Sequence, residues 1–381
     1  MPLASPVTDM QTETPTAPVV RRAHVEVLRI YDVADDIDLQ RVESLLAGRQ
    51  NFARIRLARV EPKAIAFGDP PVVTDLVAPA LDVLGIRCEV RASARIHSFG
   101  VVSVSLEVWL PRPLPWAEWQ SFAYEAEREA AGLPFWRASL DSLLDGLRPA
   151  LVDPTPVRLE EDYAIVTVRE LDPPLSAAAL QEAVDLVPLL THERRPLSES
   201  ARAEVLKHAH SYYTDDLAVL TWDRAFVLEP SPDDDVADVL EVVNAQLLEL
   251  RFYDAMLDTE LPRVYRQAAA VRGRRAILQG EYSRTAHQMR ALVAEITQIT
   301  EKVDNAIKVT EDVYLARVYS SALELFRVRF WADSIDRKLA LIRDTYTALY
   351  DEAMATRAEL LETAIVLLIV LEIVLAFALG H

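Results

Sequence analysis

The alternation of apolar and polar residues in the first half of the chain predicts a mixture of strands and helices. From His24 the segment HVEVLRIYDV alternates as a strand does, and DDIDLQRVESLL follows with helical spacing and acidic residues in its first turn. Further strands are predicted at ARIRLARV, KAIAFGD, GIRCEVRASARI and FGVVSVSLEVW, separated by Pro70–Pro71, Gly85 and Gly100. This half is therefore expected to fold as mixed α and β structure.

The middle of the chain continues the mixture up to Pro230. Helical patterns cover PWAEWQSFAYEAEREA and FWRASLDSLLDGL, and EDYAIVTVREL returns to the strand pattern before the break at Pro173–Pro174. Helices follow at LSAAALQEAVDLVPLL and LSESARAEVLKHA. Two apolar runs in HSYYTDDLAVLTWDRAFVLEP flank Thr221–Arg224 and predict a hairpin. After Pro230 the pattern predicts no strand.

From Asp233 onward the spacing is helical. The segment VADVLEVVNAQLLELRFYDAMLD is apolar around most of its circumference, which predicts a helix buried on several sides that joins the two halves. Two later segments carry apolar residues at alternating three and four spacing, as coiled-coil seams do. The first seam is Met289, Leu292, Ile296, Ile299, Val303 and Ala306, and the second is Ile335, Leu339, Ile342, Tyr346, Leu349, Ala353 and Leu360, broken at Thr356. The two helices fit an antiparallel hairpin within one chain and an assembly between chains equally well.

The end of the chain is apolar from Ala364 to Leu379 except for Glu372. A helix over Thr363–Leu379 covers roughly 25 Å at 1.5 Å per residue, near the short limit for a bilayer core. Glu372 opposes insertion by about 2.5 to 3.5 kcal/mol, which the surrounding Leu, Ile, Val and Phe residues offset. We therefore expect a transmembrane anchor, with burial of the last helix in a protein core as the alternative.

The position of Glu372 also predicts self-association. A carboxyl group in hydrocarbon is protonated or is paired with a group on another helix. If the second seam continued through Thr363, Leu367, Val370, Val374 and Phe377, Glu372 would lie nearly opposite it. Either the register shifts, or a second face of the helix meets another protomer, so Glu362 and Glu372 are the candidate membrane and oligomer contacts. A pore or proton path built around Glu372 is a weaker alternative, because one helix per chain would have to form a ring.

Taken together, these patterns predict an α+β protein. Residues 1–22 have no basic start and no apolar run, so they are expected to be a disordered tail and not a signal peptide. A mixed α+β domain over residues 23–230 precedes an all-helical, coiled-coil-like region over 231–361, which contains the hairpin. A transmembrane helix is predicted over 362–380. This arrangement predicts a single-pass protein of the inner (cytoplasmic) membrane with most of the chain in the cytoplasm.

Composition excludes several functional classes. The net charge of −19 argues against direct binding of nucleic acid through its phosphates, which requires a basic face. Cys88 is the single cysteine, which excludes an internal disulfide framework and disfavours a thiolate metal cluster. The phosphate-binding, zinc-protease and nucleophile-elbow motifs are absent from the sequence.

One pair of residues has the spacing of metal ligands. His208 and His210 flank Ala209, and on a strand both imidazoles would share one face, with Asp215 and Asp216 nearby. Two histidines without a third ligand are more typical of a partly exposed surface. The sequence therefore predicts no catalytic residue, no metal and no cofactor.

The ending RAELLETAIVLLIVLEIVLAF resembles the C-terminal signature of the required-for-meiotic-nuclear-division (RMND-type) family, in which Leu-Glu-Trp precedes an apolar helix interrupted by one glutamate. Leu361, Glu362 and Glu372 match this signature, and Thr363 stands where the family has Trp. The resemblance extends upstream through FWADSIDRKLALIRDTYTALYDE, which contains Tyr346, and NAQLLELRFYDAMLD, which begins at Asn244. It covers roughly the second half of the chain and suggests a bacterial member.

The resemblance implies a membrane-associated protein without established catalytic residues. Mitochondrial relatives are inner-membrane proteins that support translation and form homo-oligomers, so a supporting role in translation follows by analogy only. The function expected from the sequence is a membrane-anchored scaffold that self-associates through its C-terminal helices and binds unidentified protein partners. The alternative is a tail-anchored enzyme with an unrecognised active site.

Overall fold

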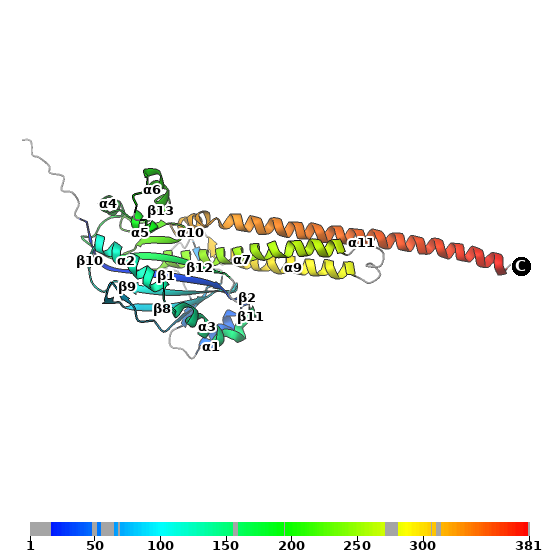
Figure 1. Cartoon of the computed structure of the whole chain (residues 1–381), viewed down its shortest axis with the longest axis horizontal. Coiled ribbons are helices and arrows are strands. Elements are labelled where there is room, and N and C mark those ends of the chain that lie inside the picture. The colour runs from blue at the N-terminus through cyan, green and yellow to red at the C-terminus, as the bar shows by residue number, and fades with distance from the viewer. Residues whose placement is uncertain are drawn as a thin grey trace, which may run out of the picture.

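The computed structural model describes residues 17–47, 52–54, 65–67, 69–154, 159–193, 195–270, 281–305, 307–309 and 314–379 of the chain. Residues 1–16 of the predicted tail and residues 55–64, which include most of the predicted strand ARIRLARV, lie outside the described residues. The assignment of residues 19–22 to the disordered tail is wrong, because these residues begin a strand that starts at Val19. The molecule consists of a body built on a sheet and of long helices that project from one side of the body (Figure 1).

The body is organised around one large sheet. Its neighbouring strands are antiparallel except β12 and β15, which run parallel. Across the sheet the order is β13 (Ala209–His210), β14 (Leu217–Leu220), β15 (Arg224–Leu228), β12 (Glu160–Asp172), β1 (Val19–Asp32), β9 (Val101–Trp109), β8 (Val90–Ile96), β5 (Val72–Asp75) and β3 (Phe52–Arg54), with β10 (Leu114–Pro115) beside β1. The hairpin predicted around Thr221–Arg224 is confirmed by β14 and β15.

Three short strand pairs lie outside this sheet. They are β2 (Ala34–Ile37) with β11 (Leu151–Pro154), β4 (Ile65–Phe67) with β16 (Ile307–Val309), and β6 (Asp82–Val83) with β7 (Ile86–Arg87). The expectation of no strand after Pro230 is therefore wrong at β16. A strand of three residues is too short to show a period of two, and its pairing partner is distant in the sequence.

The two faces of the sheet carry separate cores, as the alternation in β1 requires. Val25 and Val27 face a core that contains Trp119, whereas Leu28 and Ile30 face the core shared with the long helices. The helices of the body are α1 (Leu39–Leu46), α2 (Trp116–Ala131), α3 (Phe135–Leu147), the 3-10 helix η1 (Arg148–Ala150), α4 (Ala177–Ala183), α5 (Val187–Thr191) and α6 (Glu199–Val205).

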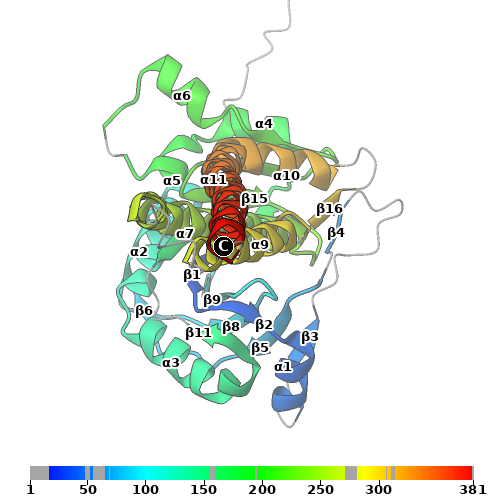
Figure 2. The same cartoon turned by 90° about the vertical axis from the view of Figure 1, so that its right-hand side faces the viewer.

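The second face is covered by α7 (Asp235–Ala270), which contacts β1, β9 and β12. Every residue from 241 to 250 of α7 is buried, which confirms the prediction of a helix buried on several sides. Further along, α7 packs with α9 (Glu281–Asp304) and α11 (Val328–Leu379), while α10 (Tyr314–Leu325) returns across the body (Figures 1 and 2).

We call the packed part of α7, α9 and α11 the stalk. It distinguishes between the two arrangements that the sequence allowed, a hairpin within one chain and an assembly between chains. α9 runs back toward the body and α11 away from it, so the two seams pack antiparallel within one chain, with α7 as a third helix. Met289, Ile296 and Val303 of α9 share a core with Ile335, Leu339, Ile342 and Leu349 of α11. The predicted seam residue Ala306 and the side chains of Ile299 and Ala353 lie outside the described residues.

The predicted membrane anchor at residues 362–380 is wrong. Within the described residues, no helix is both long enough and apolar enough to span a bilayer. The apolar run Ala364–Leu379 covers roughly 24 Å, short of the ~30 Å hydrocarbon core, and is interrupted by Glu372. The predicted single-pass location in the inner membrane is therefore wrong as well. Residues 361–375 are also exposed and not buried in a core of this chain.

Candidate functional site

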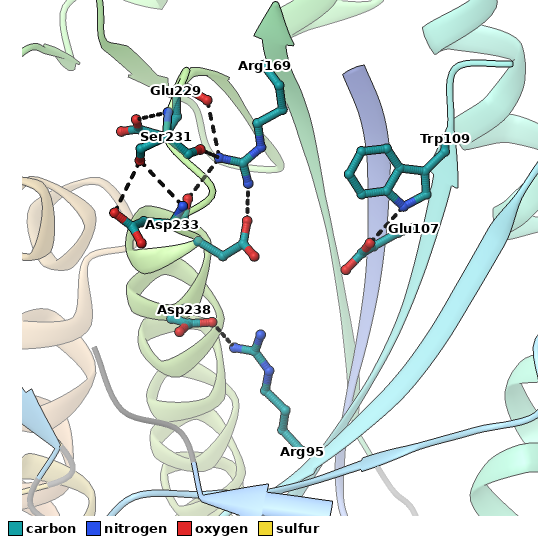
Figure 3. A network of polar contacts seen from close by, with 9 residues as sticks. Arg95, Glu107, Trp109, Arg169, Glu229, Ser231, Asp233 and Asp238 are labelled. Atoms are coloured by element: carbon teal, nitrogen blue, oxygen red, sulfur yellow. Dashed lines mark hydrogen bonds and ion pairs between the residues drawn. The ribbon is translucent and has the colours of Figure 1, made fainter. Parts of the chain in front are cut away.

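A cluster of charged side chains lies where the sheet meets the start of α7. Alternate residues of β1, β8 and β9 face this helix, because residues i and i+2 of a strand share a face. We call this cluster the charged junction, and Figure 3 shows part of it. Its members are Glu26, Arg95, Ser103, Glu107, Arg169, Asp234, Asp238 and Glu241.

Arg95 of β8 is the centre of the charged junction. Its Nη1 lies 2.5 Å from Oδ1 of Asp238 and 2.9 Å from Oε2 of Glu241, two residues one turn apart on α7. The Ser103 hydroxyl donates a hydrogen bond to the second oxygen of Glu241. Because all three charged side chains are largely buried, each ion pair is poorly screened by water.

Burial raises the pKa of both Asp238 and Glu241, and the Arg95 cation opposes that rise. Burial likewise lowers the pKa of Arg95, but Asp238, Glu241 and Glu26 together raise it above its usual value. Arg95 therefore stays charged. The junction is held by one cation that balances two carboxylates from the same helix face.

Two carboxyl groups face each other in the same region of the sheet. Glu26 of β1 and Glu107 of β9 are direct cross-strand neighbours, and like charges in this arrangement repel. Burial is the largest cause of the raised pKa of each group. The Glu107 carboxylate raises the pKa of Glu26 further, and Asp234 raises the pKa of both. Trp109 Nε1 donates to Glu107 at 2.9 Å, and the indole lies tilted against the His24 ring, with 4.5 Å between ring centroids.

Arg169 of β12 holds the loop that leads into α7. Its Nη1 donates to the carbonyl oxygens of Glu229, Ser231 and Asp233 at 3.2, 2.8 and 2.8 Å, and its Nη2 pairs with Asp234 (Figure 3). Three carbonyl contacts and one carboxylate contact use the planar donor fork of a single guanidinium. The direction in which α7 leaves the sheet is therefore fixed by Arg169 before α7 and by Arg95 in its first two turns.

The histidine pair considered from the sequence is not gathered into a metal site. His208 Nδ1 lies 2.7 Å from the Ser321 hydroxyl of α10, and Asp216 Oδ1 accepts bonds from the backbone N–H groups of Tyr212 and Tyr213. Asp216 thus stabilises the turn between β13 and β14. Across the described residues, no group of three His, Cys, Asp or Glu side chains is placed to hold a metal ion.

The candidate contact residues from the sequence lie at the other end of the molecule. α11 continues past the ends of α7 and α9 (Figure 1), and we call residues 361–375 its free end. Leu361 is 66% exposed, and Glu362 and Glu372 are both exposed. The exposed large apolar residues of the free end are Leu361, Ile365, Val366, Leu367, Leu368, Ile369, Val370, Leu371, Ile373, Val374 and Leu375.

Asn244 and Tyr346, the other residues of the RMND-type resemblance, belong neither to the charged junction nor to the free end. Asn244 is buried in α7, where its Nδ2 donates to the Leu240 carbonyl at 2.8 Å. Tyr346 is half-buried in the stalk, with the Arg290 guanidinium of α9 5.4 Å from its ring centroid. Both residues support packing of the long helices, and neither lies with Leu361 on the free end.

Sequence reasoning missed the charged junction. Arg95, Glu107, Asp238 and Glu241 lie in separate strands and in a helix, and nothing in their spacing indicates that they meet. One local signal was present, because Glu26, Ser103, Ser105 and Glu107 are polar positions in strands that are otherwise buried on both faces. Such a strand predicts polar partners from a covering element.

A family model described as "Uncharacterized protein MJ0711, N-terminal domain" matches residues 22–235, which run from β1 to the first residue of α7. The chain belongs to this MJ0711 N-terminal domain family. The uncharacterized protein MJ0711 of Methanocaldococcus jannaschii is 28% identical over 225 residues, covering 57% of this chain and 66% of that protein. The chain thus spans just under two thirds of the length of this relative. No solved structure matches the chain.

The match to the MJ0711 N-terminal domain family includes most of the charged junction but not the free end of α11. It contains the sheet and the junction residues Glu26, Arg95, Glu107 and Arg169, but ends before Asp238 and Glu241. The stalk and the free end of α11 lie outside the matched residues. The family therefore accounts for the body of the molecule.

Proposed function

We propose that this chain is an interaction protein, in which the body orients a helical stalk and copies of the chain join through the free end of α11. The observation that carries the proposal is the exposure of the free end, whose large apolar residues are each 47–66% exposed. Monomeric proteins rarely expose contiguous apolar surface of this extent, and such surfaces mark sites of interaction.

A second copy of the chain is the partner that this surface fits. Apart from Glu362, Thr363 and Glu372 the free end is apolar, so it is complementary in chemistry to the apolar surface of a second copy. Covering its exposed side chains removes on the order of several hundred Å² of apolar surface per copy, from about 60–120 Å² for a fully buried apolar side chain. This approaches the ~800 Å² per partner of a standard stable interface.

The charged junction sets the direction of the stalk relative to the body. Arg95 and Arg169 fix the start of α7, and α7 packs along α9 and α11, so the free end is held at a defined distance from the body. A rigid spacer of this kind suits a scaffold that holds several bodies, and the partners bound to them, in a fixed arrangement.

We further propose that the chain is related to the RMND-type family in its helical half. Leu361, Glu362 and Glu372 support this kinship, and they lie outside the residues matched by the family model, so the two relationships concern different parts of the chain. The resemblance would carry with it a supporting role in translation in a bacterial cell. With a net charge of −19, contact with ribosomes would run through protein partners, and co-sedimentation with ribosomal particles on sucrose gradients tests this role.

An enzymatic function has one observation in its favour. Glu26 and Glu107 are facing carboxyl groups with raised pKa values, as catalytic acids require. Buried ion-pair networks that only stabilise a fold raise pKa values in the same way, and these two groups belong to such a network. The interaction function is therefore the better supported of the two.

Light scattering of the purified chain at micromolar concentration tests the proposal. We expect a dimer or larger assembly for the unmodified chain and a monomer for Leu371→Asp, which places a charge in the free end. Leu341→Asp is the matched control, because Leu341 is 47% exposed, close to the 53% of Leu371, but lies on the outside of the stalk and not on the free end. A monomeric unmodified chain would refute the proposal.

A further inference from the structure

Exposed apolar residues continue from the free end of α11 along the outside of the stalk. Tyr350 and Met354 are 53% and 48% exposed, whereas the neighbouring Leu349 is buried against α7 and α9. α11 therefore has an inner seam that holds the stalk together and a second apolar face without a partner among the described residues. This second face is turned by one residue, about 100°, from the inner seam.

The second face has the spacing of a coiled-coil seam. Steps of four and three residues connect Tyr350, Met354, Arg357, Leu361, Ala364, Leu368, Leu371 and Leu375, all of them exposed. This seam runs for roughly 38 Å along the helix. Arg357 is its one charged member, and Glu372 lies directly beside Leu371 on its flank. A helix that packed on this face would leave the inner seam undisturbed.

We propose that two copies of the chain pack α11 against α11 in antiparallel orientation along this seam, an arrangement that rests on the self-association proposed above. Each layer then pairs two seam residues: Tyr350 with Leu375, Met354 with Leu371, Arg357 with Leu368, and Leu361 with Ala364. Tyr350 and Met354, which the free ends alone would not cover, are buried by the end of the second copy.

Charge complementarity favours this register. In it, Arg357 of one copy lies opposite Leu368 of the second copy, one helical turn from Glu372 of that copy. The long side chain of Arg357 reaches this carboxylate, so the only charged residue of the seam and the only charged residue of the apolar run become partners. The twofold symmetry of the pair makes the same contact twice.

The shape of the molecule favours the same orientation. The start of α11 lies against the body, while the free end projects beyond the stalk (Figure 1). Antiparallel packing points the two bodies away from each other. Parallel packing would bring both bodies to the same side of a single pair of helices and would place Arg357 against Arg357.

Cysteine cross-linking tests the orientation in full-length chains in which buried Cys88 is replaced by Ser. One protein carries Met354→Cys and another Leu371→Cys. We expect a disulfide-linked dimer when the two are mixed and oxidised, and none from either alone, because in each the two copies of the cysteine lie ~25 Å apart along the antiparallel pair. Cross-linking of either variant alone would overturn the antiparallel register.

Light scattering of the same samples separates this inference from the function on which it rests. An assembly that forms but yields no cross-link in the mixture overturns the register and leaves self-association standing, whereas a monomer refutes both. A charge exchange adds a second readout. We expect Arg357→Glu to weaken association about tenfold and Arg357→Glu with Glu372→Arg to restore it to within about threefold of the unmodified chain. Failure of the double variant to restore association would overturn the Arg357–Glu372 contact.

Discussion

Arg95 and Asp238 bridge the sheet and the long helices, with 2.5 Å between the guanidinium Nη1 and the carboxylate Oδ1. Arg95 comes from β8, the third strand from the β3 edge of the sheet, and Asp238 from the first turns of α7 (Figure 3). Because Glu241 shares the same guanidinium, one side chain neutralises two buried acids. This contact joins the shared apolar core in attaching the long helices to the body.

Replacing Arg95 with Met should lower the free energy of unfolding by about 3–5 kcal/mol, because Asp238 and Glu241 would be left buried without a cation. Both carboxyl groups have a raised pKa in the folded state, so they bind more protons when folded than when unfolded. Their stabilising contribution is therefore greatest at low pH and is lost as the pH rises. Urea unfolding should show a larger deficit at pH 8 than at pH 5.

Arg91→Met is the control for this substitution. Arg91 lies on the same strand and pairs with Glu89 at the surface, where an ion pair contributes at most about 1 kcal/mol. Equal losses for the two variants would show that the Arg95 contact contributes no more than a surface pair.

Replacing Glu249 with a neutral residue should stabilise the fold. It is buried in α7, and within the described residues no basic side chain forms an ion pair with it. Burial, Asp32 and Asp35 raise its pKa well above the usual value, against a hydrogen bond from Tyr253. Glu249→Gln removes the cost of burying this charge and should raise the free energy of unfolding by about 1–2 kcal/mol at pH 8.

The gain from Glu249→Gln should shrink as the pH falls, because the raised pKa of Glu249 favours its protonated, neutral form in the folded state. The matched variant Glu241→Gln has the opposite expectation, since it removes a partner of Arg95 and should destabilise the fold at pH 8. Denaturant midpoints at both pH values check the pair, and a loss of stability for both variants would contradict the interpretation of Glu249.

His97 should make the protein sensitive to mild acid. Burial, aided by the nearby Arg95 cation, lowers the pKa of His97 to about 3, so the folded state resists a proton that the unfolded state accepts near pH 6.5. Its contribution to stability is present above pH 6.5 and is lost as the pH falls. His97→Phe should therefore reduce the stability lost between pH 7 and pH 5 by about 2 kcal/mol.

Thermal or urea unfolding at the two pH values measures this difference. His287→Phe, at an exposed position of α9, is the control substitution. An identical pH profile for the unmodified chain and His97→Phe would contradict the prediction.

Gly100 should tolerate no side chain. It has a φ of +94°, and an added Cβ would lie 1.8 Å from the carbonyl oxygen of Ala34, where the turn between β8 and β9 meets β2. Gly100→Ala should lower the free energy of unfolding by about 3 kcal/mol or more. Gly85→Ala has a similar φ of +77° but open space around the added atom, so it should lose only about 1 kcal/mol. Equal urea midpoints for the two variants would contradict the collision at Ala34.

The sequence alone determined the mixed α and β half, the hairpin at Thr221–Arg224 and the long helices after Asp233. These features arise from local periodicity and turn chemistry, which neighbouring residues express wherever the segment lies. The seam residues Met289, Ile296, Ile335 and Ile342 were predicted correctly for the same reason. Periodicity also showed which residues of α11 could meet a helix, but not which helix.

Tertiary structure decided the rest. Only the packed chain brings Arg95 within reach of Asp238 and Glu241, because residues more than 140 positions apart carry no mutual signal in one sequence. The same holds for β16, whose three residues become a strand only through pairing with β4. The prediction of a membrane anchor in the apolar run ending at Leu379 was wrong, because composition shows that a helix is apolar but not what surrounds it. α7 and α9 end before α11 does, so they cover only its first part. The free end of α11 is therefore exposed.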